Sequence, residues 1–167
     1  MADLMRTKIT VGVVLAAIAV AAIFFLYPRK TAPEVRFSAL SGETFSTSEL
    51  RGKVVLVNFW ATYCASCVKE MPQLAETHRK FAPRGFETVA VAVRKDDPAR
   101  VAEFAASRAL PFKVVVDSSG EAAREFGNVR ITPMSFLIDR QGRVLKRYVG
   151  EPDWAEFHRL VESALAR

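Results

Sequence analysis

The chain has 167 residues, two cysteines and a formal net charge of +6 at pH 7. Half of its residues are hydrophobic and 25% are charged, which is typical of a globular protein and excludes a disordered, collagen-like or disulfide-scaffold chain. The length allows one ordinary domain with an appendage, and the lysines and arginines are too scattered to predict a nucleic-acid partner.

Residues 9–27 form an apolar stretch without a charge, with basic residues on both sides. A helix of this length covers about 28 Å, close to the hydrocarbon core of a bilayer, so we expect an uncleaved transmembrane signal anchor. A cleaved secretory signal is the alternative. With an anchor, residues 1–8 lie in the cytoplasm and residues 28–34 form a tether. Residues 35–167 then form one domain on the extracytoplasmic or periplasmic side of the inner (cytoplasmic) membrane, which the chain crosses once.

The first half of the domain predicts a β-α-β unit behind a small N-terminal hairpin at 37–45. The run 53–60 is apolar and β-branched, which favours a central strand buried on both faces. A helical pattern over 65–81, with Pro72 inside it, leads to a second strand at 86–93.

The second half predicts further strands and helices in alternation. Asp97 and Pro98 are an N-cap and first-turn pair that opens a helix ending near Ala109. The remaining expected elements are a strand at 113–117, a short helix at 121–126, a hairpin of 134–139 with 143–149, and a final helix from Pro152. The fold class is therefore α/β, with helices that cover a mixed sheet.

The two cysteines, Cys64 and Cys67, lie where the central strand has ended and the first long helix begins. Residues three apart in a helical turn have Cα atoms about 5 to 6 Å apart, which is within the range that a disulfide accepts. The helix N-terminus also favours a thiolate at the first cysteine. We therefore expect Cys64 to be a nucleophile and Cys67 the resolving thiol.

Other interpretations of this pair are a static disulfide, a zinc site, two inert thiols or a copper-carrying pair. A disulfide across so short a loop constrains the unfolded chain little. Zinc needs two further ligands, and His78 and His158 lack the spacing of a zinc finger, so we expect no metal. Copper(I) stays open, because thiolates suit it.

Four stretches beside the C-x-x-C pair carry a family resemblance over about 35–167. They are residues 50–62 (LRGKVVLVNFWAT), 70–72 (EMP), 131–133 (ITP) and 136–142 (FLIDRQG). With these motifs the chain resembles the thioredoxin superfamily, and within it the TlpA/ResA-type membrane-anchored thiol-disulfide oxidoreductases, which include cytochrome c biogenesis thioredoxins. The resemblance implies a thioredoxin fold with an N-terminal β-hairpin extension, a redox-active Cys64-Cys67 disulfide and no cofactor.

The same resemblance implies roles for five further residues. Pro133 would be a cis-proline that faces the disulfide, and Thr132 would offer backbone hydrogen bonds to a substrate chain. Trp60 and Tyr63 would complete the substrate-binding surface. Glu70 would be the catalytic acid near the resolving thiol, the alternative being a solvated glutamate on a helix.

The function expected from these features is a membrane-tethered enzyme that reduces disulfides of exported proteins, such as apocytochrome c or a copper-site protein, by thiol-disulfide exchange. A membrane electron donor would restore the reduced pair. One alternative is a peroxiredoxin, although Ala61 stands where that family has a threonine before its reactive cysteine. The other is a copper-binding assembly factor that uses both cysteines as ligands.

Overall fold

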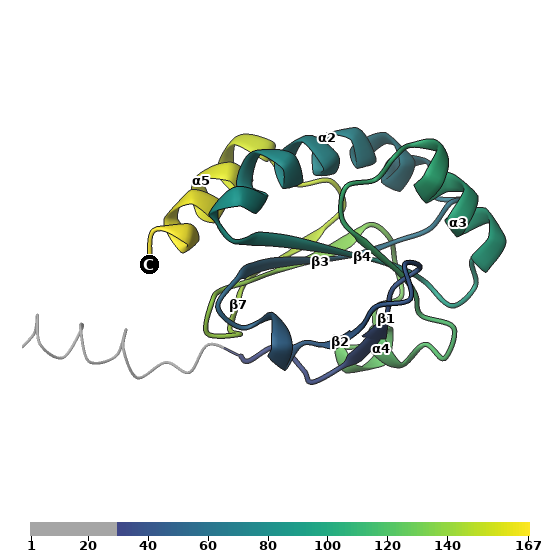
Figure 1. Ribbon diagram of the computed structural model, residues 1–167, viewed down its shortest axis with the longest axis horizontal. Helices are drawn as coiled ribbons and strands as arrows, with labels where there is room; N and C mark the ends of the chain where they lie inside the picture. The colour runs from purple at the N-terminus through teal and green to yellow at the C-terminus, as the bar shows by residue number, and fades with distance from the viewer. Residues whose placement is uncertain (1–29) are drawn as a thin grey trace, which may run out of the picture. The chain divides into compact units, whose positions relative to one another are not determined.

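The computed structural model describes residues 30–167 (Figure 1). The expected anchor at 9–27 and the segment 1–8 lie outside the described residues. Over 30–167, no helix is both long enough and apolar enough to cross a membrane.

A five-stranded mixed sheet forms the centre of the domain, with β3 (Val54–Trp60) as its middle strand. The strand order is β5-β4-β3-β6-β7; β3, β4 and β5 are parallel, whereas β6 is antiparallel to both β3 and β7. All residues of β3 are buried, as its apolar run predicts. The other strands are β4 (Phe86–Ala92), β5 (Lys113–Val116), β6 (Met134–Ile138) and β7 (Val144–Val149).

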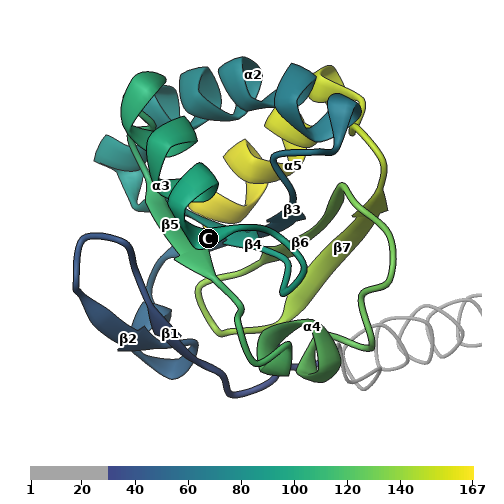
Figure 2. The same ribbon diagram turned by 90° about the vertical axis from the view of Figure 1, so that its right-hand side faces the viewer.

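Helices cover one face of this sheet, and the opposite face carries a short helix and a hairpin (Figures 1 and 2). The first layer contains α2 (Ala65–Phe81), α3 (Pro98–Ser107) and α5 (Trp154–Leu165). The second contains α4 (Glu121–Glu125) and the pair β1 (Arg36–Ser38) and β2 (Thr44–Ser46). Two 3-10 turns complete the elements, η1 (Ser48–Leu50) and η2 (Ala82–Arg84). The α/β class with a mixed sheet and flanking helices is confirmed.

Successive side chains of β3 point to opposite faces of the sheet, so this strand contributes to two separate hydrophobic cores. Leu56 and Trp60 pack with residues of α2, α3 and α5, whereas Val57 and Phe59 pack with residues of the hairpin and α4. Asn58 has the same parity as Leu56 and Trp60, so this polar side chain lies on the α2 side of the sheet.

The hairpin lies where the sequence predicts it. Phe37 pairs with Phe45 across the two strands, and their ring centroids are 5.3 Å apart. The turn contains Gly42 at a φ of +87°, a conformation that glycine adopts without strain. The Leu40 amide donates to the carbonyl of Val114 at 2.8 Å, which attaches the hairpin to the sheet edge.

The starts of α3 and α5 coincide with capping aspartates. The Asp97 carboxylate accepts from the amide of Ala99 at 2.9 Å, as predicted. The predicted start of the last helix at Pro152 is wrong, because α5 begins at Trp154 and Asp153 is its N-cap. An aspartate that accepts an amide of the first turn is the stronger helix-start signal.

Candidate active site

Cys64 and Cys67 form a disulfide at the N-terminus of α2, with their Cα atoms 5.2 Å apart. Cys64 is the N-cap residue in an extended conformation, and its sulfur accepts from the amide of Cys67 at 3.3 Å. This amide is one of the donors that a helix leaves unpaired at its N-terminus. The same donor and the helix dipole would stabilise negative charge on the Cys64 sulfur after reduction.

The two cysteines differ in their access to solvent. Cys67 is completely buried in the core beneath α2, whereas Cys64 is half-buried. Tyr63, next to Cys64, is 60% exposed. An incoming disulfide can therefore reach the first cysteine and not the second.

A buried carboxylate holds the turn before Cys64 in place. Asp96 lies in the loop after β4 and is 5% exposed. It accepts from the Thr62 amide at 2.5 Å and from the Thr62 hydroxyl at 2.6 Å. It also accepts from the amide of Asp97 at 3.0 Å. The sequence analysis missed Asp96, whose only signal was an acidic residue in the loop that follows the second strand of the β-α-β unit.

Replacement of Asp96 by alanine should lower the free energy of unfolding by about 2 to 3 kcal/mol, since three bonds to one buried carboxylate disappear. The matched control is Asp97→Ala, which removes a single capping bond and should cost about 1 kcal/mol. Urea unfolding of the oxidised proteins measures both values. Equal losses for the two variants would contradict the role of Asp96.

Glu70 lies one helical turn after Cys67 on the same face of α2, and it is only 1% exposed. The alternative that Glu70 is a solvated helix glutamate is therefore wrong. The Asn58 amide donates to Glu70 Oε1 at 2.9 Å and to the Ser135 hydroxyl at 2.9 Å. Ser135 was also missed, because it pairs with Asn58 across β3 and β6, far apart in the sequence.

The second carboxyl oxygen of Glu70 is buried and has no hydrogen-bond partner. Burial disfavours the charged form and raises the pKa of Glu70 to about 7, and the charge of Glu151 acts in the same direction. The hydrogen bond from Asn58 opposes this shift without cancelling it. Glu70 can therefore hold or release a proton near neutral pH beside the buried cysteine.

The loop before β6 carries Thr132 and Pro133, and the peptide bond between them is cis, as expected. Pro133 is buried and Thr132 is half-buried. Thr132 and Tyr63 line the same surface groove, of about 720 Å³. The structure thus brings together two of the residues expected to bind substrate.

Trp60 does not belong to that surface, which corrects the expectation that it binds substrate. Its side chain is 0% exposed, and its ring centroid is 5.1 Å from that of Phe104 in α3. As the last residue of β3 it points into the helix-side core, because strand residues alternate between the faces. Trp60 stabilises the floor beneath the site and offers no surface to a client.

Both histidines are engaged away from the cysteines. A ring nitrogen of His78 lies 3.3 Å from the Thr88 hydroxyl, and one of His158 lies 2.9 Å from the Thr77 hydroxyl. Over residues 30–167, no group of three or more His, Cys, Asp and Glu side chains has an arrangement that could hold a metal ion.

A family model for redoxin proteins matches residues 28–163 of the sequence. The chain belongs to the redoxin family. The thiol-disulfide oxidoreductase ResA of Bacillus thuringiensis subsp. konkukian (strain 97-27) is 36% identical over 122 residues, which are 73% of this chain and 69% of that protein. ResA of Geobacillus thermodenitrificans (strain NG80-2) is 36% identical over 120 residues, 72% of this chain and 68% of that protein.

The fold is shared with solved thioredoxin-type structures. The crystal structure of a thiol:disulfide interchange protein of the thioredoxin family from Chlorobium tepidum TLS superposes with a TM-score of 0.75 at 31% identity, over 83% of this chain and 97% of that one. The thioredoxin-like fold and the ResA/TlpA type of redoxin are thereby confirmed. The chain is a thiol-disulfide oxidoreductase with a C-x-x-C pair.

Proposed function

We propose that the enzyme is a membrane-tethered reductase that transfers electrons from Cys64 and Cys67 to disulfides of exported proteins. The observation that carries this proposal is the asymmetry of the pair. Cys64 is reachable at a helix N-terminus, whereas Cys67 is buried one turn before a buried carboxyl group, Glu70. Such an arrangement suits one attacking and one resolving thiol.

The exchange takes place in two steps. The Cys64 thiolate attacks a client disulfide, forming a bond to one client sulfur while the other leaves as a thiolate. Cys67 then gives up its proton to Glu70 and attacks the Cys64 sulfur, so that the second client sulfur leaves as a thiolate. The client gains two electrons and takes up two protons, and the enzyme is left with the Cys64-Cys67 disulfide.

The sequence and the family support the proposed compartment and partners. The apolar stretch 9–27 would anchor the chain, the tether 28–34 would follow it, and the domain 35–167 would face the extracytoplasmic side of the inner membrane. An exported compartment is oxidising, so a membrane electron donor must restore the dithiol. Apocytochrome c and copper-site proteins are the proposed clients, because their cysteines must be reduced before haem or metal insertion.

A Cys67→Ser variant should trap these clients in cells as mixed disulfides with Cys64, since the resolving thiol is absent. A lone Cys64 thiolate forms a mixed disulfide by attacking a client disulfide, so clients that arrive oxidised are captured. Non-reducing electrophoresis of an extracytoplasmic fraction, followed by mass spectrometry of the linked proteins, identifies the clients. Cys64→Ser is the matched control and should trap none. If Cys67→Ser also traps none, the proposed reductase function is overturned.

A further inference from the structure

The groove beside the redox pair has walls from three separate parts of the chain. Tyr63 comes from the loop before α2, and Thr132 comes from the loop between α4 and β6. The segment after β4 contributes Arg94 and Lys95, and α4 with the loop that follows it contributes Arg124 and further residues. Part of the lining is apolar, through residues such as Val93, Ala123 and Val129.

The polar lining of this groove is basic. Arg94, Lys95, Arg124 and Arg130 line it, and none of the lining residues is an aspartate or glutamate. Two of the cations approach the same glycine: a Cβ built on Gly120 would lie 3.7 Å from Arg94 Nε and 3.5 Å from Arg124 Nη1. Like charges gathered along one groove repel each other, and an anion bound there would relieve the repulsion.

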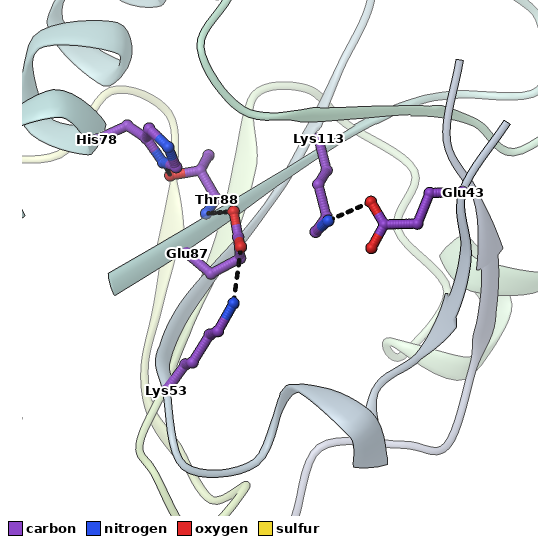
Figure 3. A network of polar contacts seen from close by, with 6 residues as sticks. All are labelled: Glu43, Lys53, His78, Glu87, Thr88 and Lys113. Atoms are coloured by element: carbon purple, nitrogen blue, oxygen red, sulfur yellow. Dashed lines mark hydrogen bonds and ion pairs between the residues drawn. The ribbon is translucent and has the colours of Figure 1, made fainter. Parts of the chain in front are cut away.

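The cations of this groove have no carboxylate partner among residues 30–167, where the ion pairs found within 4.0 Å involve other lysines and arginines. Arg124 donates only to a backbone carbonyl, which leaves its charge uncompensated. A second groove, next to the hairpin, is lined by both Glu87 and Lys113, and each of these has an oppositely charged partner. Lys53 pairs with Glu87 at 3.2 Å and Lys113 pairs with Glu43 (Figure 3).

We infer that the basic groove binds an acidic segment of the client polypeptide beside the disulfide that Cys64 attacks. This inference rests on the proposed function, because a disulfide within reach of Cys64 places the client's own flanking residues over Tyr63 and Thr132. Carboxylates of that segment would lie against Arg94 and Arg124, beside Gly120. Arginine suits this task, since its planar fork matches a carboxylate.

The test compares model clients on the reduced full-length enzyme. Three peptides of equal length, each closed by one disulfide, carry four aspartates, four asparagines or four lysines next to it. Quenched-flow mass spectrometry gives the rate constant for reduction of each peptide. At low ionic strength we expect the acidic peptide to react about tenfold faster than the neutral one and the basic peptide to react more slowly, because opposite charges accelerate association. Added salt should bring the three rates together.

A charge-matched pair of variants assigns the preference to the groove. The first variant changes Arg94, Lys95, Arg124 and Arg130 to glutamine and should bring the acidic-to-neutral ratio close to one. The control variant changes four other cations to glutamine and should keep the acidic-to-neutral ratio unchanged. These cations are exposed and distant from Cys64 in the sequence: Arg51, Arg79, Lys80 and Arg84. Both variants lose the same net charge, so only the position of the charges differs.

The outcomes are judged by the acidic-to-neutral ratio of rate constants. Any change in the reactivity of Cys64 itself affects both rate constants equally and therefore cancels from this ratio. A ratio near one in the unaltered enzyme overturns the inference, while reduction of all three peptides leaves the proposed function standing. A ratio that persists in the groove variant, or that falls equally in the control variant, also overturns it. If none of the peptides is reduced, the proposed function fails.

Discussion

In the reduced enzyme, iodoacetamide should modify Cys64 about a hundred times faster than Cys67. The structure gives two reasons for this difference, stabilisation of the Cys64 thiolate by the helix N-terminus and solvent access. Cys64 caps α2 and accepts a backbone amide, which favours its thiolate, whereas Cys67 is 0% exposed. Timed quenching and mass spectrometry of the two cysteine-containing peptides measures both rates.

The difference in solvent access between Cys64 and Cys67 accounts for most of the expected difference in their alkylation rates. The helix N-terminus increases the thiolate fraction of Cys64 at neutral pH. A more stable thiolate is also a weaker nucleophile, so these two effects partly cancel. The remainder must come from the burial of Cys67, which reacts only when the start of α2 opens locally.

Urea provides the control for this interpretation, because unfolding removes both the burial and the helix terminus. In denaturant the two cysteines should react at nearly the same rate. A Ser66→Ala variant tests the neighbouring hydroxyl, 3.4 Å from the Cys64 sulfur, and should leave the difference largely intact. Equal rates in the folded enzyme would contradict the assignment of Cys64 as the nucleophile.

Local patterns sufficed to predict the elements that position the cysteines. A continuous β-branched run has few alternatives to a buried strand, and the helix at 65–81 was predicted with the observed ends. The C-x-x-C pair lies between them, so its place at a helix N-terminus follows from the same two elements. These inferences need only neighbours along the chain.

The contacts that tune the site could not be predicted, because they join distant segments. Asn58 links Glu70 to Ser135 across a sheet register that the sequence does not specify. Trp60 has a side chain of the type expected at a binding surface, but its position in β3 directs it into the core. The basic groove likewise combines cations from the segments after β4 and around α4, which appear merely scattered in the sequence.

Glu70→Gln should remove a pH-dependent loss of stability from the oxidised enzyme. The pKa of Glu70 is about 7 in the folded state and near 4.5 in an unfolded chain. A group whose pKa is raised by folding contributes its full stability below the unfolded pKa and loses it as the pH rises through the folded value. Between about pH 5 and about pH 8 this loss amounts to about 2 to 3 kcal/mol.

The comparison must be made between the two proteins at each pH, because other groups titrate in the same range. Burial lowers the pKa of His78 and of His158, and lowered histidine pKa values make stability rise with pH, opposite to the effect of Glu70. The cysteines do not interfere, since the disulfide persists in both the folded and the unfolded oxidised protein. The histidine contributions cancel in the difference between Glu70→Gln and the unaltered enzyme.

Urea unfolding at about pH 5 and about pH 8 therefore isolates the contribution of Glu70. The free energy of unfolding of Glu70→Gln, relative to the unaltered enzyme, should be about 2 to 3 kcal/mol higher at the upper pH than at the lower one. Glu103→Gln, at an exposed position of α3, is the matched control and should show no such change. A relative stability of Glu70→Gln that stays constant between the two pH values would mean that Glu70 is ionised throughout. In that case the pKa of Glu70 would lie far below that of a thiol, and Glu70 would be a much weaker base toward Cys67 than the exchange requires.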